Sequence, residues 1–125
     1  MKTEQLDGGT LEHWSVEEVA RAFEANEIAL IDVRTTPEYM FEHVDGALLM
    51  PMAFFRPDKL PDQAQKRLVF YCGSGARSER VARRTLEAGV QPVAHMAGGF
   101  AAWKQARLPY MGTEMSTGAP KRVEP

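Results

Sequence analysis

The sequence predicts an α/β fold, an open parallel sheet of about five strands with helices on both faces. Short apolar runs alternate along the chain with helical segments, which is the order produced when parallel strands are joined by crossover helices. The apolar runs are continuous, as expected of strands covered on both faces. A length of 125 residues and ordinary apolar and charged fractions suit a single domain, and the chain has no internal repeat.

The first clear element is a helix over residues 16–25. Ser15-Val16-Glu17-Glu18 has the spacing of a capping box, and apolar residues then recur on one helical face. Residues 11–14 are compatible with a short strand before it. After the helix, residues 28–33 form a continuous apolar run with β-branched side chains, which predicts a buried strand.

The middle of the chain predicts shorter elements. Pro37 suits the first turn of a short helix that ends near Phe41. Asp45-Gly46 then predicts a turn into a second apolar run at residues 47–50, which Pro51 ends. Proline interrupts residues 52–65, so we expect a loop there with room for one helical turn.

The second half continues the alternation of strand and helix. A strand at residues 68–71 leads into a glycine-containing loop, and a helix follows from residue 78 to residue 88, where Gly89 ends it. Residues 93–96 predict the last strand and residues 100–107 the last helix. Beyond Pro109 the chain is rich in Gly, Pro, Thr and charge, and we expect it to be frayed. The expected divisions are an N-terminal segment 1–9, a domain 10–110 and a flexible C-terminal tail 111–125.

Composition argues against several classes of function. A formal net charge of −2 gives no general attraction to phosphate backbones or anionic lipid, so we expect no nucleic-acid partner and no membrane. The N-terminus lacks the apolar core of a secretory signal and no apolar run could cross a bilayer, which predicts a cytoplasmic location. A single cysteine allows no internal disulfide, and the three histidines have no close ligand spacing, so we expect no metal. The histidines are His13, His43 and His95.

Cys72 is the candidate nucleophile. It follows a buried strand and precedes a helix, at the end of the sheet where loop amides and the helix dipole favour a thiolate. Gly73 and Gly75 allow the loop to curl around the sulfur with several N–H groups aimed at it, and Arg77 can close this cradle with a permanent positive charge. We therefore expect an ionised, exposed sulfur; the alternative is a buried structural cysteine.

The helix after the loop carries an excess of positive charge. Arg80, Arg83 and Arg84 outnumber Glu79 and Glu87, which predicts a positive local field. The same three arginines equally suit a solvated helix face, and the sequence alone leaves both interpretations open.

The segment Cys72-Gly73-Ser74-Gly75-Ala76-Arg77-Ser78 resembles the active-site loop of the rhodanese family, in which a cysteine, four intervening residues and an arginine form a cradle for a persulfide. Further motifs in the family's order extend the resemblance over residues 10 to 110. They are Ile31-Asp32-Val33-Arg34, Glu38-Tyr39, His43-Val44-Asp45-Gly46-Ala47 with Pro51, Gly98-Gly99-Phe100 with Trp103, and Leu108-Pro109. Two features depart from the pattern: Glu42, where a glycine commonly stands, and the tail, which has no family counterpart.

The resemblance implies a rhodanese-like sheet and a sulfurtransferase that needs no metal or organic cofactor. In the family's scheme the Cys72 thiolate takes a sulfane sulfur from a small anionic donor such as thiosulfate and holds it as a persulfide. Because the chain has no second cysteine, the acceptor is external: cyanide, a thiol or a protein. The resemblance assigns Cys72 and Arg77 as catalytic. It assigns the anion-binding loop to Gly73, Ser74, Gly75, Ala76 and Ser78.

Residues outside the loop are assigned lesser roles. Asp32 and Arg34 are expected to form a hydrogen-bonded support near the loop, with a plain surface ion pair as the alternative. We expect His43 to fix a turn, and the other two histidines to be structural. Whether Arg56 or Lys59 reaches the mouth of the site is left open.

Two other functions remain as alternatives. Phosphatases and arsenate reductases related to rhodaneses carry one more residue between cysteine and arginine, so the shorter loop here favours a sulfur-sized anion. A noncatalytic rhodanese-like module that binds a partner or senses redox state is the second alternative, although such modules often lack the cysteine.

Overall fold

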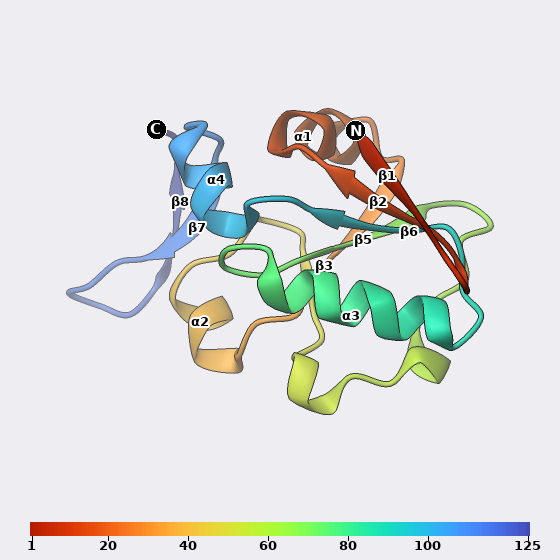
Figure 1. Ribbon diagram of the computed structural model, residues 1–125. Coiled ribbons are helices and arrows are strands. Elements are labelled where there is room, and N and C mark those ends of the chain that lie inside the picture. Colours follow the sequence, from red (N-terminus) through yellow and green to blue (C-terminus); the bar gives the residue numbers. More distant parts are fainter.

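The computed structural model describes residues 1–125 and confirms the α/β fold, with a six-stranded sheet in the order β1-β2-β6-β5-β3-β4 (Figure 1). β1 runs antiparallel to β2, and the remaining neighbours in this sheet pair in parallel. The strands are β1 (Lys2–Leu6), β2 (Gly9–Trp14), β3 (Ile28–Asp32), β4 (Leu48–Leu49), β5 (Arg67–Tyr71) and β6 (Val93–Met96).

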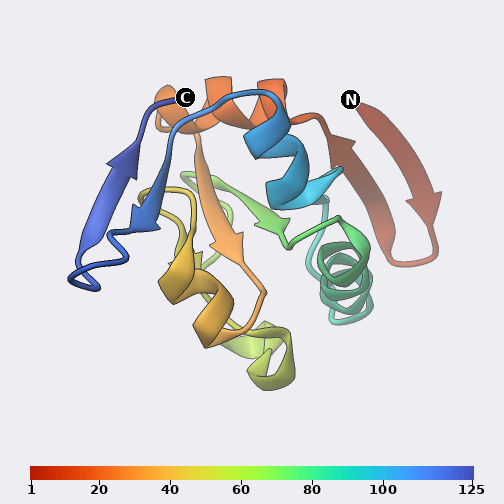
Figure 2. The same ribbon diagram turned by 90° about the vertical axis from the view of Figure 1, so that its left-hand side faces the viewer.

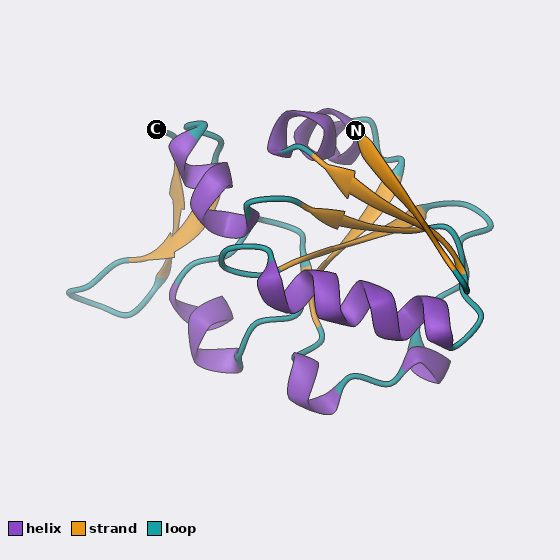
Figure 3. Cartoon of the chain, viewed as in Figure 1, coloured by secondary structure: helices purple, strands orange, loops and turns teal.

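Helices cover both faces of the sheet, as predicted (Figures 2 and 3). One face packs against α3 (Ala76–Glu87) and the segment with two 3₁₀ turns, η1 (Met52–Phe54) and η2 (Pro57–Lys59). The other packs against α1 (Val16–Glu24) and α4 (Gly99–Gln105). No helix is long and apolar enough to span a membrane.

The alternation of side chains along β5 divides the core between these two faces. Leu68 and Phe70 point toward α3, together with Cys72 just beyond the strand. Val69 and Tyr71 point toward α1 and α4. Because side chains alternate with a period of two, the residue that follows Tyr71 is placed on the α3 face.

Capping residues set where the helices before the site begin. Ser15 caps α1 and Thr35 caps α2 (Thr36–Phe41), and both helices carry a complete capping box. In α2 the reciprocal residue is Glu38, whose carboxylate accepts a bond from the Thr35 amide at 3.0 Å. The cap therefore fixes the position of Glu38, which also contacts the candidate site.

Three expectations about strands were incomplete. The segment 1–9 contains β1, which is polar because it is an exposed edge strand, so the main sheet has six strands. The run at residues 47–50 pairs only over Leu48–Leu49. The tail expected to be frayed forms a second sheet of two antiparallel strands, β7 (Tyr110–Thr113) and β8 (Pro120–Val123).

Contacts with the domain explain why the tail has regular structure. His43 and Met111 form an isolated bridge with two backbone hydrogen bonds, of 3.0 and 2.8 Å. The Tyr110 ring packs edge-on against Phe100 at 5.4 Å. These contacts join residues far apart in sequence, so the composition of the tail did not indicate them.

Candidate active site

The loop that begins at Cys72 lies between β5 and α3, at the carboxyl end of the central strand. Gly75 is the N-cap of α3 and has a φ of 110°, in the left-handed region that favours glycine. The loop can therefore reverse direction within four residues and present the first amides of α3 to the sulfur.

Several hydrogen-bond donors converge on the Cys72 sulfur. The Gly75 amide donates to Sγ at 3.1 Å and the Ser78 amide at 3.3 Å, and the Cys72 thiol itself donates to the Ser78 hydroxyl oxygen at 3.6 Å. Burial raises the pKa of the Cys72 thiol, but the bonds from Ser78 and from the Gly75 and Ser74 amides outweigh it, so the pKa lies below its ordinary value. The loop is thus arranged to stabilise a thiolate.

The carbonyl groups of the same loop point away from the sulfur, toward α4. The Phe100 amide donates to the Cys72 carbonyl at 2.8 Å, and the Ala101 amide donates to the Gly73 carbonyl at 3.0 Å. Gly99 permits this contact, because a Cβ there would lie 2.6 Å from the Cys72 carbonyl oxygen. The bond to the Gly73 carbonyl fixes the peptide plane that carries the Ser74 amide, one of the amides that lower the pKa of Cys72.

The expectation of an exposed sulfur was wrong, since Cys72 is only 1% exposed. It was placed on the α3 face by the alternation of β5, and the loop folds over it. The sulfur is nevertheless contacted by the Gly75 and Ser78 amides. Ser74 and Ala76, whose side chains are exposed, form the outer surface of the loop.

Arg77 lies at the end of the loop but makes its hydrogen bonds to Glu38. The two N–O distances are 2.8 and 3.0 Å. The guanidinium holds the pKa of the Glu38 carboxyl at about 2. The charge expected to close the cradle is therefore paired, and Glu38 is a site residue to which the sequence analysis gave no role.

The positive field expected from the helix is also reduced by pairing. Arg83 lies 3.1 Å from Glu4 and 3.0 Å from Glu79. The Arg84 guanidinium lies over the Phe55 ring at 5.3 Å. Arg80 is exposed. Only Arg83 of these three arginines has a carboxylate partner, so the positive field is reduced but Arg80 and Arg84 keep unpaired charge.

Asp32 and Arg34 form a buried ion pair beneath the loop. Arg34 donates to both carboxylate oxygens, with Nη2 2.8 Å from Oδ2, and to the Glu42 carbonyl at 2.6 Å. Its guanidinium lies 4.8 Å from the centre of the Phe100 ring. The Phe100 amide also bonds to the Cys72 carbonyl, so the pair contacts the loop through Phe100.

Three other residues lie outside this network. The His43 Nδ1 bonds to the Tyr39 carbonyl at 2.7 Å, in accord with the expected role in a turn. Arg56 pairs with Asp58 at 2.9 Å, and neither Arg56 nor Lys59 makes a hydrogen bond or ion pair with the loop.

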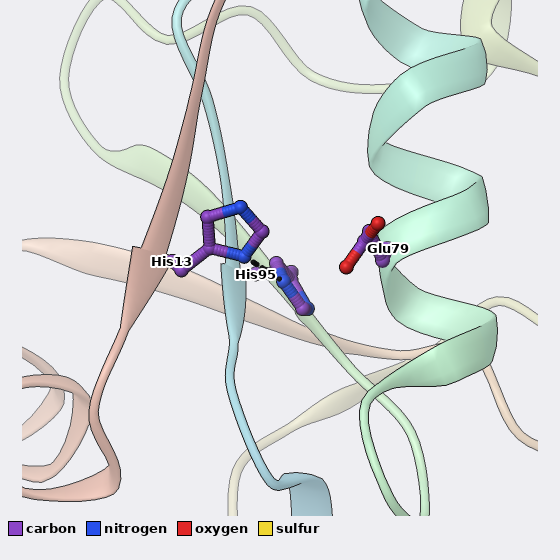
Figure 4. Close-up of side chains that lie close together, drawn as sticks. All are labelled: His13, Glu79 and His95. Carbon is purple, nitrogen blue, oxygen red and sulfur yellow. Dashed lines mark hydrogen bonds between the residues drawn. The ribbon is translucent and has the colours of Figure 1, made fainter. Parts of the chain in front are cut away.

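The two remaining histidines lie together beside the site, which the sequence did not indicate. His13 on β2 and His95 on β6 point toward one another and toward Glu79 of α3 (Figure 4). His13 Nδ1 and His95 Nε2 are 2.8 Å apart and share a hydrogen bond. His95 Nδ1 lies 2.9 Å from the Ser78 hydroxyl, so this cluster touches the cysteine loop. Nitrogen and carboxylate groups of the cluster are potential metal ligands, yet the two facing nitrogens already bond to each other.

Comparison with known proteins identifies a family for this chain. A family profile described as "Rhodanese-like domain" matches residues 15–106. The chain is 38% identical over 87 residues to an uncharacterised protein, slr1261, of Synechocystis sp., covering 70% of this chain and 49% of that protein. The chain thus spans about half the length of that relative. It is 33% identical over 78 residues to the thiosulfate sulfurtransferase GlpE of Coxiella burnetii, covering 62% of this chain and 73% of GlpE.

Solved structures show the same fold. A rhodanese-related protein from Thermoplasma volcanium matches with a TM-score of 0.70 at 17% identity, covering 79% of this chain and 96% of that one.

Proposed function

Because the chain belongs to the rhodanese family, we propose that it is a sulfurtransferase that carries a sulfane sulfur on Cys72 as a persulfide. The convergence of the Gly75 and Ser78 amides on the Cys72 sulfur supports this proposal most directly. Amides directed at a sulfur stabilise negative charge there, which both the thiolate and the persulfide carry. Similarity to GlpE, a thiosulfate sulfurtransferase, points to thiosulfate as a donor.

The reaction consists of two displacements. In the first, the Cys72 thiolate attacks the outer sulfur of thiosulfate, a Cys–S–S bond forms, and sulfite leaves with the electron pair of the broken S–S bond. In the second, a nucleophilic acceptor attacks the outer sulfur of the persulfide and Cys72 leaves as a thiolate. Ping-pong kinetics follow, because the first product departs before the acceptor reacts.

The acceptor comes from outside the chain, since Cys72 is the only cysteine. We propose cyanide in an assay, and a thiol or a protein in the cell, as acceptors. The buried ion pair of Asp32 and Arg34 supports the loop through Phe100, and Arg77 with Glu38 holds its far end. A cytoplasmic location, the absence of a cofactor and the domain limits 10–110 remain predictions.

The burial of Cys72 favours a second candidate, a noncatalytic module that binds a partner. Cys72 is 1% exposed as a residue, which leaves a donor little surface to reach. Donor access therefore decides between the two functions.

Mass spectrometry of the intact protein after thiosulfate treatment tests the proposal. We expect a gain of one sulfur atom, removed by a reducing thiol and absent in Cys72→Ser, because serine is a weak nucleophile without a general base. Formation of thiocyanate from thiosulfate and cyanide should follow the same pattern. No mass gain in a folded protein would favour the noncatalytic module, and faster turnover of an aryl phosphate would favour a phosphatase.

A further inference from the structure

A continuous chain of hydrogen bonds leads from the cysteine to the surface of the sheet. The Cys72 sulfur is 3.6 Å from the Ser78 hydroxyl, and that hydroxyl is 2.9 Å from His95 Nδ1. His95 Nε2 is 2.8 Å from His13 Nδ1, and His13 Nε2 is 3.2 Å from the Glu4 carboxylate. Each histidine thus uses both ring nitrogens, one on each side, as a group that passes a proton must.

The register of the sheet produces this alignment. His13 and His95 are direct partners in the parallel pair of β2 and β6, so their side chains leave the sheet on the same face. Leu11 and Val93, two residues earlier on each strand, pack in the core cluster that contains Cys72 and α3 residues. The two imidazoles therefore lie between the sheet and α3, which supplies Ser78 at its first turn.

The carboxylate at the end of the chain determines the direction of every bond. Glu4 is an acceptor only, so His13 Nε2 carries a proton and a neutral His13 accepts at Nδ1. His95 then donates from Nε2 and accepts at Nδ1 from the Ser78 hydroxyl. The Ser78 oxygen in turn accepts from the Cys72 thiol. Every side-chain donor in this chain of hydrogen bonds therefore points away from the sulfur and toward Glu4.

We propose that Ser78, His95 and His13 form a proton relay that removes the proton of the Cys72 thiol and holds it on His13 beside Glu4. The S–H bond breaks as the proton moves to the Ser78 oxygen, and the Ser78 hydroxyl proton moves to His95 Nδ1. His95 Nε2 releases its proton to His13 Nδ1. One thiol becomes a thiolate, His13 becomes an imidazolium, and His95 stays neutral with its proton on the other nitrogen.

Burial makes such a route useful. Cys72 is 1% exposed and Ser78 is fully buried, so the thiol proton does not pass directly to bulk water. His13 is partly exposed and can exchange the proton with solvent. In the thiolate form, His95 donates to the Ser78 oxygen, and the hydroxyl proton of Ser78 is shared between the sulfur and the Gly75 carbonyl at 3.2 Å.

The charged groups around His95 suit a neutral relay. Lys2 and Glu4 face it from β1, His13 from β2, and Glu79 and Arg83 from α3. Burial and the neighbouring His13 lower the pKa of His95 to about 4. His95 therefore stays uncharged at neutral pH, while Glu4 lies beside the group that receives the positive charge.

The pH dependence of Cys72 alkylation by iodoacetamide tests the relay. In wild type, Cys72 should react even at mildly acidic pH, below the ordinary range of a thiol, because the relay holds its proton within the protein. In His13→Gln and His95→Asn we expect the profile to move up by about one pH unit, which lowers the rate about tenfold at that pH. Asn can still bond to Ser78 but cannot pass a proton from one ring nitrogen to another. Glu12→Gln, a neighbour of His13 on the same strand, serves as the matched control.

Chemical rescue separates proton transfer from a structural role. Added imidazole should restore the reactivity of His13→Ala, whereas the equally shaped but far less basic pyrazole should not. Superimposable profiles for wild type and both histidine variants would overturn the relay, and so would equal rescue by the two compounds. His13 is only partly buried, so its variants remain informative if His95→Asn fails to fold.

The relay deepens the proposed function, because it prepares the thiolate on which sulfur transfer rests. Alkylation needs no sulfur donor, so an experiment can refute the relay without refuting sulfur transfer, and the reverse. A wild type that forms no persulfide but shows the expected alkylation profiles would refute sulfur transfer and retain the relay.

Discussion

Burial of His95 predicts that the protein loses stability between neutral and mildly acidic pH. The side chain is 3% exposed, and burial together with His13 lowers its pKa to about 4 in the folded state. In the unfolded chain histidine has a pKa of about 6.5. As the pH falls, histidine in the unfolded state is protonated at a pH where folded His95 is still neutral. The free energy of unfolding therefore decreases.

The size of this loss follows from the two pKa values. At about pH 7 the unfolded histidine is mostly neutral, so the difference between the states is small. At about pH 5 it is almost fully protonated while folded His95 is mostly neutral. The cost is about 1.4 kcal/mol per pH unit over about 1.5 units, or roughly 2 kcal/mol between the two conditions.

Urea unfolding at the two pH values measures the effect. Wild type should lose roughly 2 kcal/mol more than His95→Asn, because the other titratable groups, including His13 and His43, remain in the variant. Comparing the two losses thus measures the contribution of His95 together with its coupling to His13. Equal losses in wild type and variant would refute the reasoning, because they would mean that folded His95 binds its proton as readily as the unfolded chain.

Two further predictions concern the loop. Gly99→Ala should cost about 2 kcal/mol or more and lower the reactivity of Cys72, because φ is +62° and the new Cβ would meet the Cys72 carbonyl at 2.6 Å. Gly89→Ala, with φ of +93° and open space around it, is the control for strain alone, and urea unfolding with alkylation should show the loss of reactivity only in Gly99→Ala. Glu38→Gln should cost less than about 1 kcal/mol near neutral pH, since its ion pair with Arg77 is about one-third exposed. That difference should shrink as the pH falls from about 4.5 and vanish as it passes through about 2, where Glu38 takes up its proton in the folded state; a difference that persists below that pH would contradict an ionic origin.

The elements that were predictable from sequence are those whose buried positions require apolar side chains. The strand predicted at residues 93–96 coincides with β6, and the helix predicted at residues 16–25 differs from α1 by one residue. The strand is a short, largely apolar run, and in the helix the apolar side chains recur on one face. β1 and β8 escaped prediction because most of their residues are exposed and polar. β7 is only partly buried and has no continuous apolar run, although it pairs with β8 nearby in the chain.

The position of the candidate loop in the fold was predictable from sequence, but its contacts were less so. The position of Cys72 between a strand and a helix follows from local sequence, as does the freedom of Gly75 to adopt a left-handed angle. The pairing of Arg77 with Glu38 crosses 39 residues, and the pairing of His13 with His95 crosses 82. Only the order of strands in the sheet brings such residues together, and local pattern does not specify that order.

The bonds from α4 to the loop carbonyls separate two properties of the loop. One is the acidity of the sulfur, which the backbone amides set, and the other is the outer surface, which the side chains form. The ring of amides is shaped by main-chain atoms and glycines, whereas Ser74 and Ala76 direct their side chains outward. Substitutions at these two positions therefore change the surface that a ligand meets while the amides that bond to the sulfur stay in place. The same loop backbone thus accommodates different outer surfaces.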